Sequence, residues 1–167
     1  MKTEFKYAAL LTVSLFLWLC FEFWIGFHDA FVDFLPLTSA LTILIWGVLL
    51  FLEIKEKQNL PGNSVRTYGK GFRTAFLTTV LAVPMLLLTR WVFYDLINPD
   101  FFNNIVIKGR EWISVSAKTE DNFNNSVKMM EDFFKMKNYQ TIVLVLNIAV
   151  GLLFSLILPL FTRKKSA

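Results

Sequence analysis

Four long apolar windows constrain this chain more than any other feature, because each is long enough to cross a lipid bilayer. They cover residues 7–27, 35–52, 72–97 and 139–161. A membrane-spanning helix needs roughly 17–25 predominantly apolar residues. Lipid offers no hydrogen-bonding partners to backbone groups, so such segments have to be helical. The windows therefore predict an all-α membrane protein with four transmembrane helices.

The composition supports a single membrane domain and gives no sign of a cofactor. Only 18% of the residues are charged, whereas a soluble domain has about 25%. The length of 167 residues fits one integral membrane domain that covers residues 1–167. The single cysteine, Cys20, lies inside the first window, so we expect a small buried apolar residue there. No metal or cofactor is expected, because the chain has no Cys or His cluster and no glycine-rich phosphate loop.

The distribution of Lys and Arg predicts the orientation, because cytoplasmic segments near membrane spans are enriched in both. The first connection contains Asp29 and Asp33 but no Lys or Arg, and residues 95–138 carry a mixture of charges. Both termini are therefore predicted to be cytoplasmic and residues 95–138 to lie outside. The net charge of +4 is thus a topology signal and gives no reason to expect nucleic-acid binding. The side predicted to be cytoplasmic collects Lys2, Lys6, Lys55, Lys57, Arg66, Lys70, Arg73, Arg163, Lys164 and Lys165.

The outer segment is predicted to form two amphipathic helices, at residues 99–117 and 120–137. Asn98 followed by Pro99 is typical of a helix start, and Thr119 can cap the second helix. We expect both helices to lie on or near the outer membrane surface, or to pack against the ends of the spans. The second helix carries an apolar stripe at steps of four, three and four: Phe123, Val127, Met130 and Phe134.

Several polar and small residues inside the windows predict how the helices pack. Thr78 and Thr79 are expected to bond back to their own helix backbone. The amide of Asn147, deep in the fourth window, is expected to bond to another helix. Gly47 and Gly151 would allow close helix approach.

Two charged residues lie inside the apolar windows, Glu22 and Arg90. Both are predicted ~8–11 Å below the outer surface, at a rise of 1.5 Å per residue. Charges at such depth are rare and usually pair. We therefore predict that Glu22 and Arg90 pair and that the first and third spans are neighbours, with His28 or Asp29 completing the network. Alternatively, Arg90 reaches outward alone and Glu22 is protonated.

His28 and Asp29 are expected to emerge at the outer boundary of the first span. If the first helix continues beyond residue 27, the carboxylates of Glu22, Asp29 and Asp33 share one stripe, and His28 lies one position off it.

Five sequence segments resemble a known family of small bacterial membrane proteins. They are "FEFWIGFHD" and "FLEIKEK" at the ends of the first two windows, "TYGKGFRTAFLTT" and "INPDFFNN" around the third, and "FTRKK" after the fourth. In this order they resemble the family filed as domain of unknown function 4199. The resemblance implies a four-span inner-membrane protein of Gram-negative bacteria with a periplasmic segment between spans three and four. It also implies a membrane glycosyltransferase acting on polyprenyl phosphates as a partner. It supplies no activity and no catalytic residue.

Three functions fit these features, and none of them is enzymatic. The first is a non-catalytic accessory or scaffolding subunit that binds another membrane protein or a second copy of itself. The second is a protein that binds the headgroup of a lipid or polyprenyl phosphate with Arg90 and His28. The third is a small proton-coupled transporter using Glu22, His28 and Asp29. A lone His beside carboxylates on one helix does not make a catalytic or metal site.

The orientation leads to a labelling prediction. Cysteines introduced by Asn63→Cys and by Asn122→Cys, each in a Cys20→Ala background, should react oppositely with a membrane-impermeant maleimide. Only the second should react in cells whose outer membrane is permeabilised, because residue 122 lies in the segment predicted to be outside. Labelling at position 63 in such cells would overturn the orientation.

Overall fold

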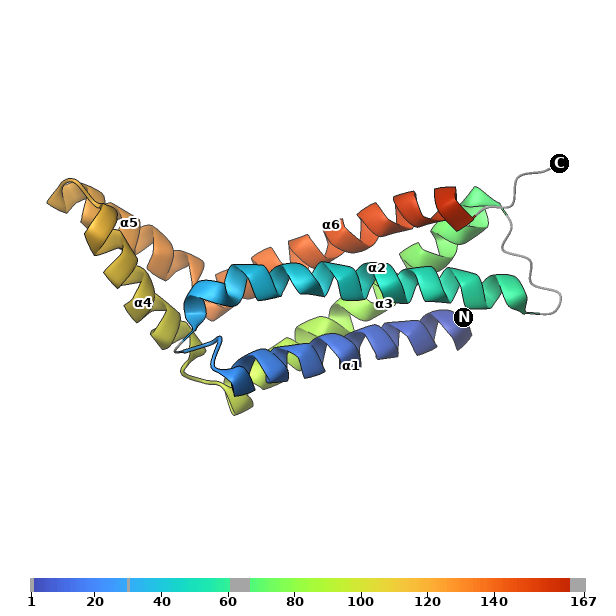
Figure 1. Cartoon of the computed structure of the whole chain (residues 1–167), viewed down its shortest axis with the longest axis horizontal. Helices are drawn as coiled ribbons and strands as arrows, with labels where there is room; N and C mark the ends of the chain where they lie inside the picture. Colours follow the sequence, from blue (N-terminus) through green and yellow to red (C-terminus); the bar gives the residue numbers. More distant parts are fainter. Residues whose placement is uncertain (1, 30, 61–66, 163–167) are drawn as a thin grey trace.

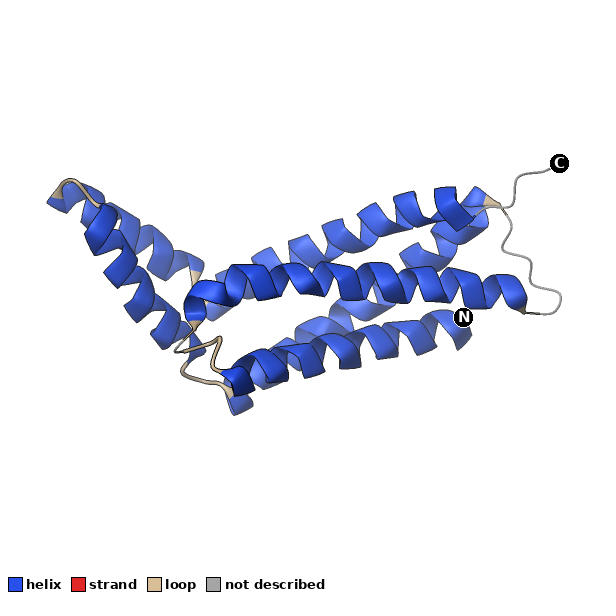
Figure 2. Ribbon diagram, viewed as in Figure 1, coloured by secondary structure: helices blue, strands red, loops and turns tan. Residues whose placement is uncertain are grey.

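The computed structural model describes the chain except for residues 1, 30, 61–66 and 163–167, and the described part is helical without strands (Figures 1 and 2). The described part contains six α-helices, and the segment directly after α3 is π-helical. Of the residues behind the orientation prediction, Asn63, Arg66, Arg163, Lys164 and Lys165 lie outside the described part. The helices are α1 (Lys2–Ile25), α2 (Leu35–Asn59), α3 (Tyr68–Val92), α4 (Phe101–Ser116), α5 (Glu120–Phe133) and α6 (Met136–Thr162), with η1 (Val32–Phe34) before α2 and η2 (Phe93–Ile97) after α3.

Helices α1, α2, α3 and α6 run side by side as an elongated bundle, and α4 and α5 form a hairpin that projects from one end (Figure 1). We call this the hairpin end, and the opposite end, where α1 begins and α6 ends, the base. Helix α3 packs against both α1 and α6, and α2 packs against the same two helices. The prediction that the first and third spans are neighbours is therefore confirmed.

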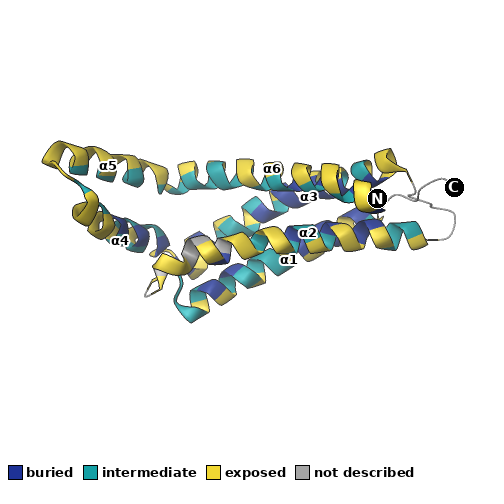
Figure 3. Ribbon diagram, turned by 45° about the horizontal axis from the view of Figure 1, so that its top comes forward, coloured by how far each residue is buried: buried dark blue, intermediate teal, exposed yellow. Residues whose placement is uncertain are grey.

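Three helices in the described part are long and apolar enough to cross a membrane: α1, α3 continued by η2, and α6. Helix α2 coincides with the predicted window 35–52 but is not among these three, so its crossing belongs to the proposal below. Many residues on the outside of the bundle are exposed, as the burial colours of Figure 3 show, and large apolar residues are prominent among them. Leu17, Leu88 and Phe161 are 60%, 63% and 76% exposed, a surface suited to lipid.

The hairpin follows the predicted helices, with a correction at each end. The second helix, predicted over residues 120–137, ends at Phe133, because α6 already begins at Met136. Thr119 caps α5, because its hydroxyl accepts a hydrogen bond from the Asn122 amide at 3.3 Å. The predicted helix start at Asn98 is wrong. The Asn98 amide donates to the Phe93 carbonyl at 2.8 Å and closes η2, so α4 begins only at Phe101.

The apolar stripe of α5 packs against α4. Gly109 of α4 leaves room for the side chain of Met130, and Arg110 contacts Glu131 across the hairpin. The four stripe residues are half-buried. Each helix of the hairpin thus covers part of the apolar face of the other.

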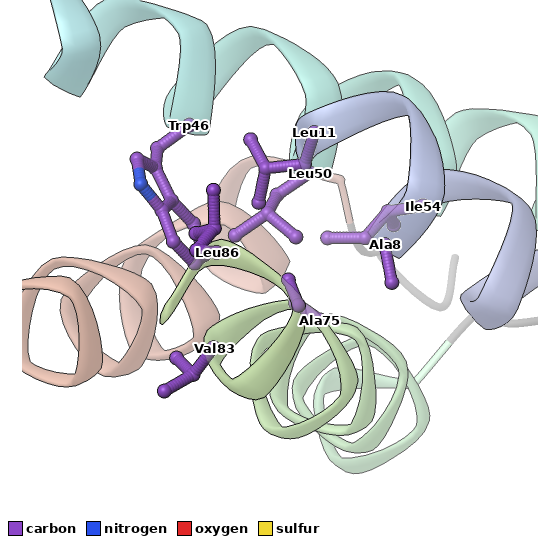
Figure 4. Close-up of a cluster of buried hydrophobic side chains, with 9 residues drawn as sticks. Ala8, Leu11, Trp46, Leu50, Ile54, Ala75, Val83 and Leu86 are labelled. Atoms are coloured by element: carbon purple, nitrogen blue, oxygen red, sulfur yellow. The ribbon is translucent and has the colours of Figure 1, made fainter. Parts of the chain in front are cut away.

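A cluster of buried apolar side chains fills the bundle and extends to its base (Figure 4). Ala8 and Leu11 of α1 meet Leu50 and Ile54 of α2 and Ala75 of α3, and all five are fully buried. The alanines let the helix backbones approach, and the branched side chains fill the space between them.

Helices α3 and α6 approach most closely where small residues face each other. A Cβ atom on Gly151 would lie 3.0 Å from the Cβ of Thr79, and one on Gly71 would lie 3.0 Å from the Cβ of Pro159. Such distances are shorter than ordinary van der Waals contacts. The Thr79 hydroxyl donates to the Ala75 carbonyl at 2.9 Å, which confirms its predicted bond to its own helix. The same prediction for Thr78 is wrong, because its hydroxyl is directed to Glu53 of α2 and to the Glu4 carbonyl of α1.

This contact leads to a stability prediction. Gly151→Ala should lower the free energy of unfolding by about 1–3 kcal/mol, because the added methyl group collides with Thr79. Adding Thr79→Ala should recover part of the loss, since it removes two of the atoms in the way. Thermal denaturation in detergent measures both effects. The matched control is Gly69→Ala, because nothing lies within 4 Å of a Cβ at that position. Equal losses at positions 69 and 151 would contradict the close contact.

Candidate functional site

The candidate site begins with the turn that ends α1. The helix stops at Ile25, and Gly26 has a φ of +92°, a conformation that glycine adopts readily and L side chains rarely do. The Phe27 amide donates to the Glu22 carbonyl at 2.9 Å and closes the turn. As a result the chain folds back on itself, and His28 returns toward Glu22.

The predicted stripe of carboxylates does not form, because α1 does not continue past this turn. Glu22 is inside the bundle and only 3% exposed. Asp29 is exposed, and its carboxylate accepts a hydrogen bond from the Asn104 side chain of α4. Asp33 lies in the separate turn η1. Asp29 therefore ties the end of α1 to the hairpin and is not part of an intramembrane network.

His28 is buried, contrary to the expectation that it emerges at the boundary. Its exposure is 1%, and its Nδ1 atom lies 3.0 Å from Nδ2 of Asn98, which is itself 4% exposed. Phe93 and Phe101 pack around the imidazole with ring centroids 5.6 and 5.0 Å away. When Asn98 donates through its Nδ2, Nδ1 of His28 accepts and the ring proton lies on Nε2.

The carboxylate of Glu22 has two neighbours within the same end of the bundle. The Trp18 indole N–H donates to Oε1 at 2.9 Å, and Nε2 of His28 lies 3.8 Å from Oε2. Glu22 is thus held by one neutral donor on its own helix and faces a histidine from the turn.

Arg90 of α3 is held by tyrosines. It donates to the hydroxyl of Tyr94 at 3.2 Å and to that of Tyr139 at 3.5 Å. The guanidinium also lies over both rings, 5.7 and 5.9 Å from their centroids, where cation–π attraction acts. Its Nε atom is buried without a hydrogen-bond partner in the described part of the chain.

The predicted ion pair between Glu22 and Arg90 is not formed in this structure. The ion pairs found among the described residues within 4.0 Å do not include these two side chains. They act on each other only through longer-range attraction. Trp18 is the hydrogen-bond partner of Glu22 where Arg90 was predicted, and Tyr94 and Tyr139 are the partners of Arg90 where Glu22 was predicted.

A cavity of about 460 Å³ lies between α1, α2, α3 and α6 at the hairpin end, and Glu22, His28 and Arg90 all line it. Nearer the middle of the bundle it reaches Trp46, whose indole N–H donates to the Asn147 side chain at 3.2 Å. That bond confirms the predicted contact of Asn147 with another helix. Most of the remaining lining residues are apolar, among them Leu15, Phe16, Leu19, Ile43, Leu86, Ile142, Val143, Leu146 and Val150.

Two of the lining residues reach from the cavity to the outer surface of the bundle. Ile43 of α2 and Leu146 of α6 line the cavity and are also 43% and 57% exposed.

Sequence reasoning missed several residues of this site, and helical spacing could have found two of them. Trp18 lies four residues before Glu22 and Tyr94 four residues after Arg90, which puts each beside its partner on one helix face. For Asn98, the sequence predicts only a helix start and not a contact with His28. Tyr139 carries no signal of this kind, because α6 brings it in from a distant part of the chain.

The chain matches the family model described as "Protein of unknown function (DUF4199)" over residues 6–164. No curated protein and no solved structure matches it.

The Asn98–His28 contact leads to a second stability prediction. Asn98→Ala should lower the free energy of unfolding by about 1–3 kcal/mol, because it leaves a buried ring nitrogen of His28 without a partner. Asn103→Ala is the matched control, since Asn103 is exposed on α4. Thermal denaturation in detergent compares the two, and a similar small effect of both would contradict a structural role for the bond.

Proposed function

Because the chain belongs to the DUF4199 family of proteins of unknown function, its role has to be inferred from the cavity, and we propose that it binds an amphiphile with an anionic headgroup there. Lipid phosphates and polyprenyl phosphates are molecules of this class. The observation that carries the proposal is Arg90, an arginine in an apolar bundle that lines the cavity and has no carboxylate of the described residues within 4.0 Å.

The cavity has the size and polarity that such a ligand needs. Its volume of about 460 Å³ falls within the roughly 300–1,000 Å³ of ordinary ligand pockets. Glu22, His28 and Arg90 gather near the hairpin end, and a mostly apolar lining continues toward Trp46 and Val150. A headgroup would lie beside Arg90, and part of its chain would lie along the apolar wall.

Arg90 is suited to an anion because its present partners do not neutralise it. Tyrosine hydroxyls accept its hydrogen bonds, but they carry no charge. The guanidinium presents donors in a planar fork that matches phosphate and carboxylate oxygens. The unpaired Nε is a further donor that a ligand oxygen would satisfy.

His28 adds a second donor to the same cavity. It is buried, and its Nε2 atom has no hydrogen-bond partner in the described part of the structure. Asn98 holds the ring from the other side, so Nε2 is the position that carries the proton when Asn98 donates. A phosphate oxygen near His28 and Arg90 would accept from both. Glu22 stays with Trp18 and orients the imidazole.

The proposal includes a placement in the membrane. Helix α2 would be the fourth span, and the hairpin would lie on the periplasmic side of a bacterial inner membrane with both termini in the cytoplasm. The three long apolar helices support a membrane location, and the excess of Lys and Arg near the base supports the orientation. The cavity would then lie at the level of the outer leaflet.

A second candidate is supported by the hairpin. Trp112, Val115 and Met129 are 47%, 90% and 74% exposed on α4 and α5. Exposed aromatic and apolar side chains of this kind are typical of binding surfaces. A non-catalytic subunit that docks on another membrane protein, such as a membrane glycosyltransferase, or on a second copy, would use this surface. The two roles are compatible, because the hairpin adjoins the cavity through Phe133.

Ligand binding is tested with dodecyl phosphate, a single-chain anionic amphiphile, and with dodecanol, which lacks the charge. Binding to the purified protein is followed by native mass spectrometry and by the fluorescence of Trp18 and Trp46, which line the cavity. Arg90→Gln should weaken dodecyl phosphate binding about tenfold or more. Hydrogen bonds to charged groups contribute about 1.5–3 kcal/mol, and 1.4 kcal/mol corresponds to a factor of ten.

Two controls make this test specific. Arg73→Gln removes an exposed arginine near the base and should leave binding unchanged. Val143→Trp should weaken the binding of both amphiphiles, because it fills the cavity. The proposal would be contradicted if Arg90→Gln and Arg73→Gln weakened the binding of dodecyl phosphate equally. It would also be contradicted if the protein bound dodecyl phosphate and dodecanol with equal affinity.

A further inference from the structure

The base of the bundle holds a second buried polar cluster, away from the cavity. Glu4 of α1 and Glu53 of α2 are 3% and 0% exposed, although the sequence places both among the charges of the predicted cytoplasmic boundary. Lys57 of α2 and the hydroxyls of Thr74 and Thr78 of α3 complete the cluster.

Among the described residues, the cation of this cluster is Lys57, and it contacts Glu4 and not Glu53. The Lys57 ammonium contacts the Glu4 carboxylate and lies 3.1 Å from the Thr74 hydroxyl. The charged groups that act on Glu53 are Glu4 from α1 and Lys57 and Glu56 from its own helix. Helix α3 presents only the uncharged Thr78 to it. Glu56 is engaged at the bundle edge, where Lys6 lies 2.7 Å away and Tyr7 donates to it at 2.8 Å.

The contacts of Glu53 are those of a carboxylic acid. Its Oε1 atom lies 2.5 Å from the Thr78 hydroxyl, and Oε2 is buried without a hydrogen-bond partner in the described part of the chain. The same hydroxyl lies 3.5 Å from the backbone carbonyl of Glu4. A hydroxyl has a single proton and can donate to only one of these two oxygens. A proton on Glu53 would satisfy both contacts, since Glu53 would donate to Thr78 and Thr78 to the carbonyl.

We propose that Glu53 is a proton-binding site that holds its proton at neutral pH through the chain Glu53–Thr78–Glu4 carbonyl. Without that proton, Glu53 would be a fully buried carboxylate that no cation among the described residues contacts. Burying such a charge in an apolar bundle is costly. The short distance between Glu53 and Thr78 also leaves no room for a metal cation between their oxygens. This site does not depend on the ligand proposed for the cavity.

The proton is detected by infrared spectroscopy of the full chain in lipid nanodiscs. The difference spectrum between the protein and Glu53→Gln at neutral pH should contain the C=O stretch of a protonated carboxylic acid, shifted on transfer to D₂O. Thr78→Val should move this band to higher frequency, because it removes the hydrogen-bond partner. Glu56→Gln is the matched control, since Glu56 is the neighbouring carboxylate with its own cation, and it should leave the band intact.

If the Glu53→Gln protein folds poorly, a pH titration of the unchanged protein tests the proposal instead. Raising the pH of the unchanged protein should abolish the band and lower the melting temperature together, because the folded state loses a proton that it holds more tightly than the unfolded state does. Arg90→Gln should leave both changes in place. The absence of an acid band at neutral pH, or a melting temperature that depends on sodium concentration instead of pH, would overturn the proposal.

Discussion

The contact between α3 and α6 at Thr79 and Gly151 influences the shape of the whole bundle, because α1 packs against α3, and α2 packs against both α3 and α6. Toward the base, small residues such as Ala75 allow close approach, and branched side chains fill the interior. At the hairpin end the small residues give way to aromatic ones, which form a separate packed cluster around Phe93 and Tyr94. Bulky rings hold helix backbones farther apart than alanines do, and the cavity lies at this end. The gradient of side-chain size along the bundle thus places the cavity at the hairpin end.

The charged residues at the two ends of the bundle have different kinds of partner, and both proposals depend on this difference. At the base, Lys57 compensates Glu4 by direct contact, and a proton would neutralise Glu53. At the hairpin end, Glu22 and Arg90 line one cavity but each is held by neutral aromatic partners. A charge held by neutral groups keeps most of its ability to bind an external ion, whereas a charge in a contact pair has lost it. Ligand binding is therefore expected at the hairpin end and not at the base.

The helices were predictable from the sequence, while the site was predictable only in part. Apolar windows located all four bundle helices because length and hydropathy are local properties, and the Thr119 cap followed from its own neighbours. The apposition of Glu22 and His28 was missed, because it depends on a positive φ at Gly26, which sequence spacing does not reveal. The burial of Glu53 was missed for another reason. It follows an apolar window as boundary charges do, and only the packing of α1 and α3 against α2 covers it.

The arrangement of the two polar regions favours binding over transport. Along α2, Trp46 borders the cavity and Glu53 follows seven residues later, a distance of roughly 10 Å at 1.5 Å per residue. Leu50 lies between them, fully buried against Leu11 and Ala8 in the core cluster of the bundle. A proton or headgroup passing from one region to the other would have to open this core. Any effect of the Glu53 proton on the cavity would therefore act through the packing of α1, α2 and α3, by changing how tightly their ends at the base are held together.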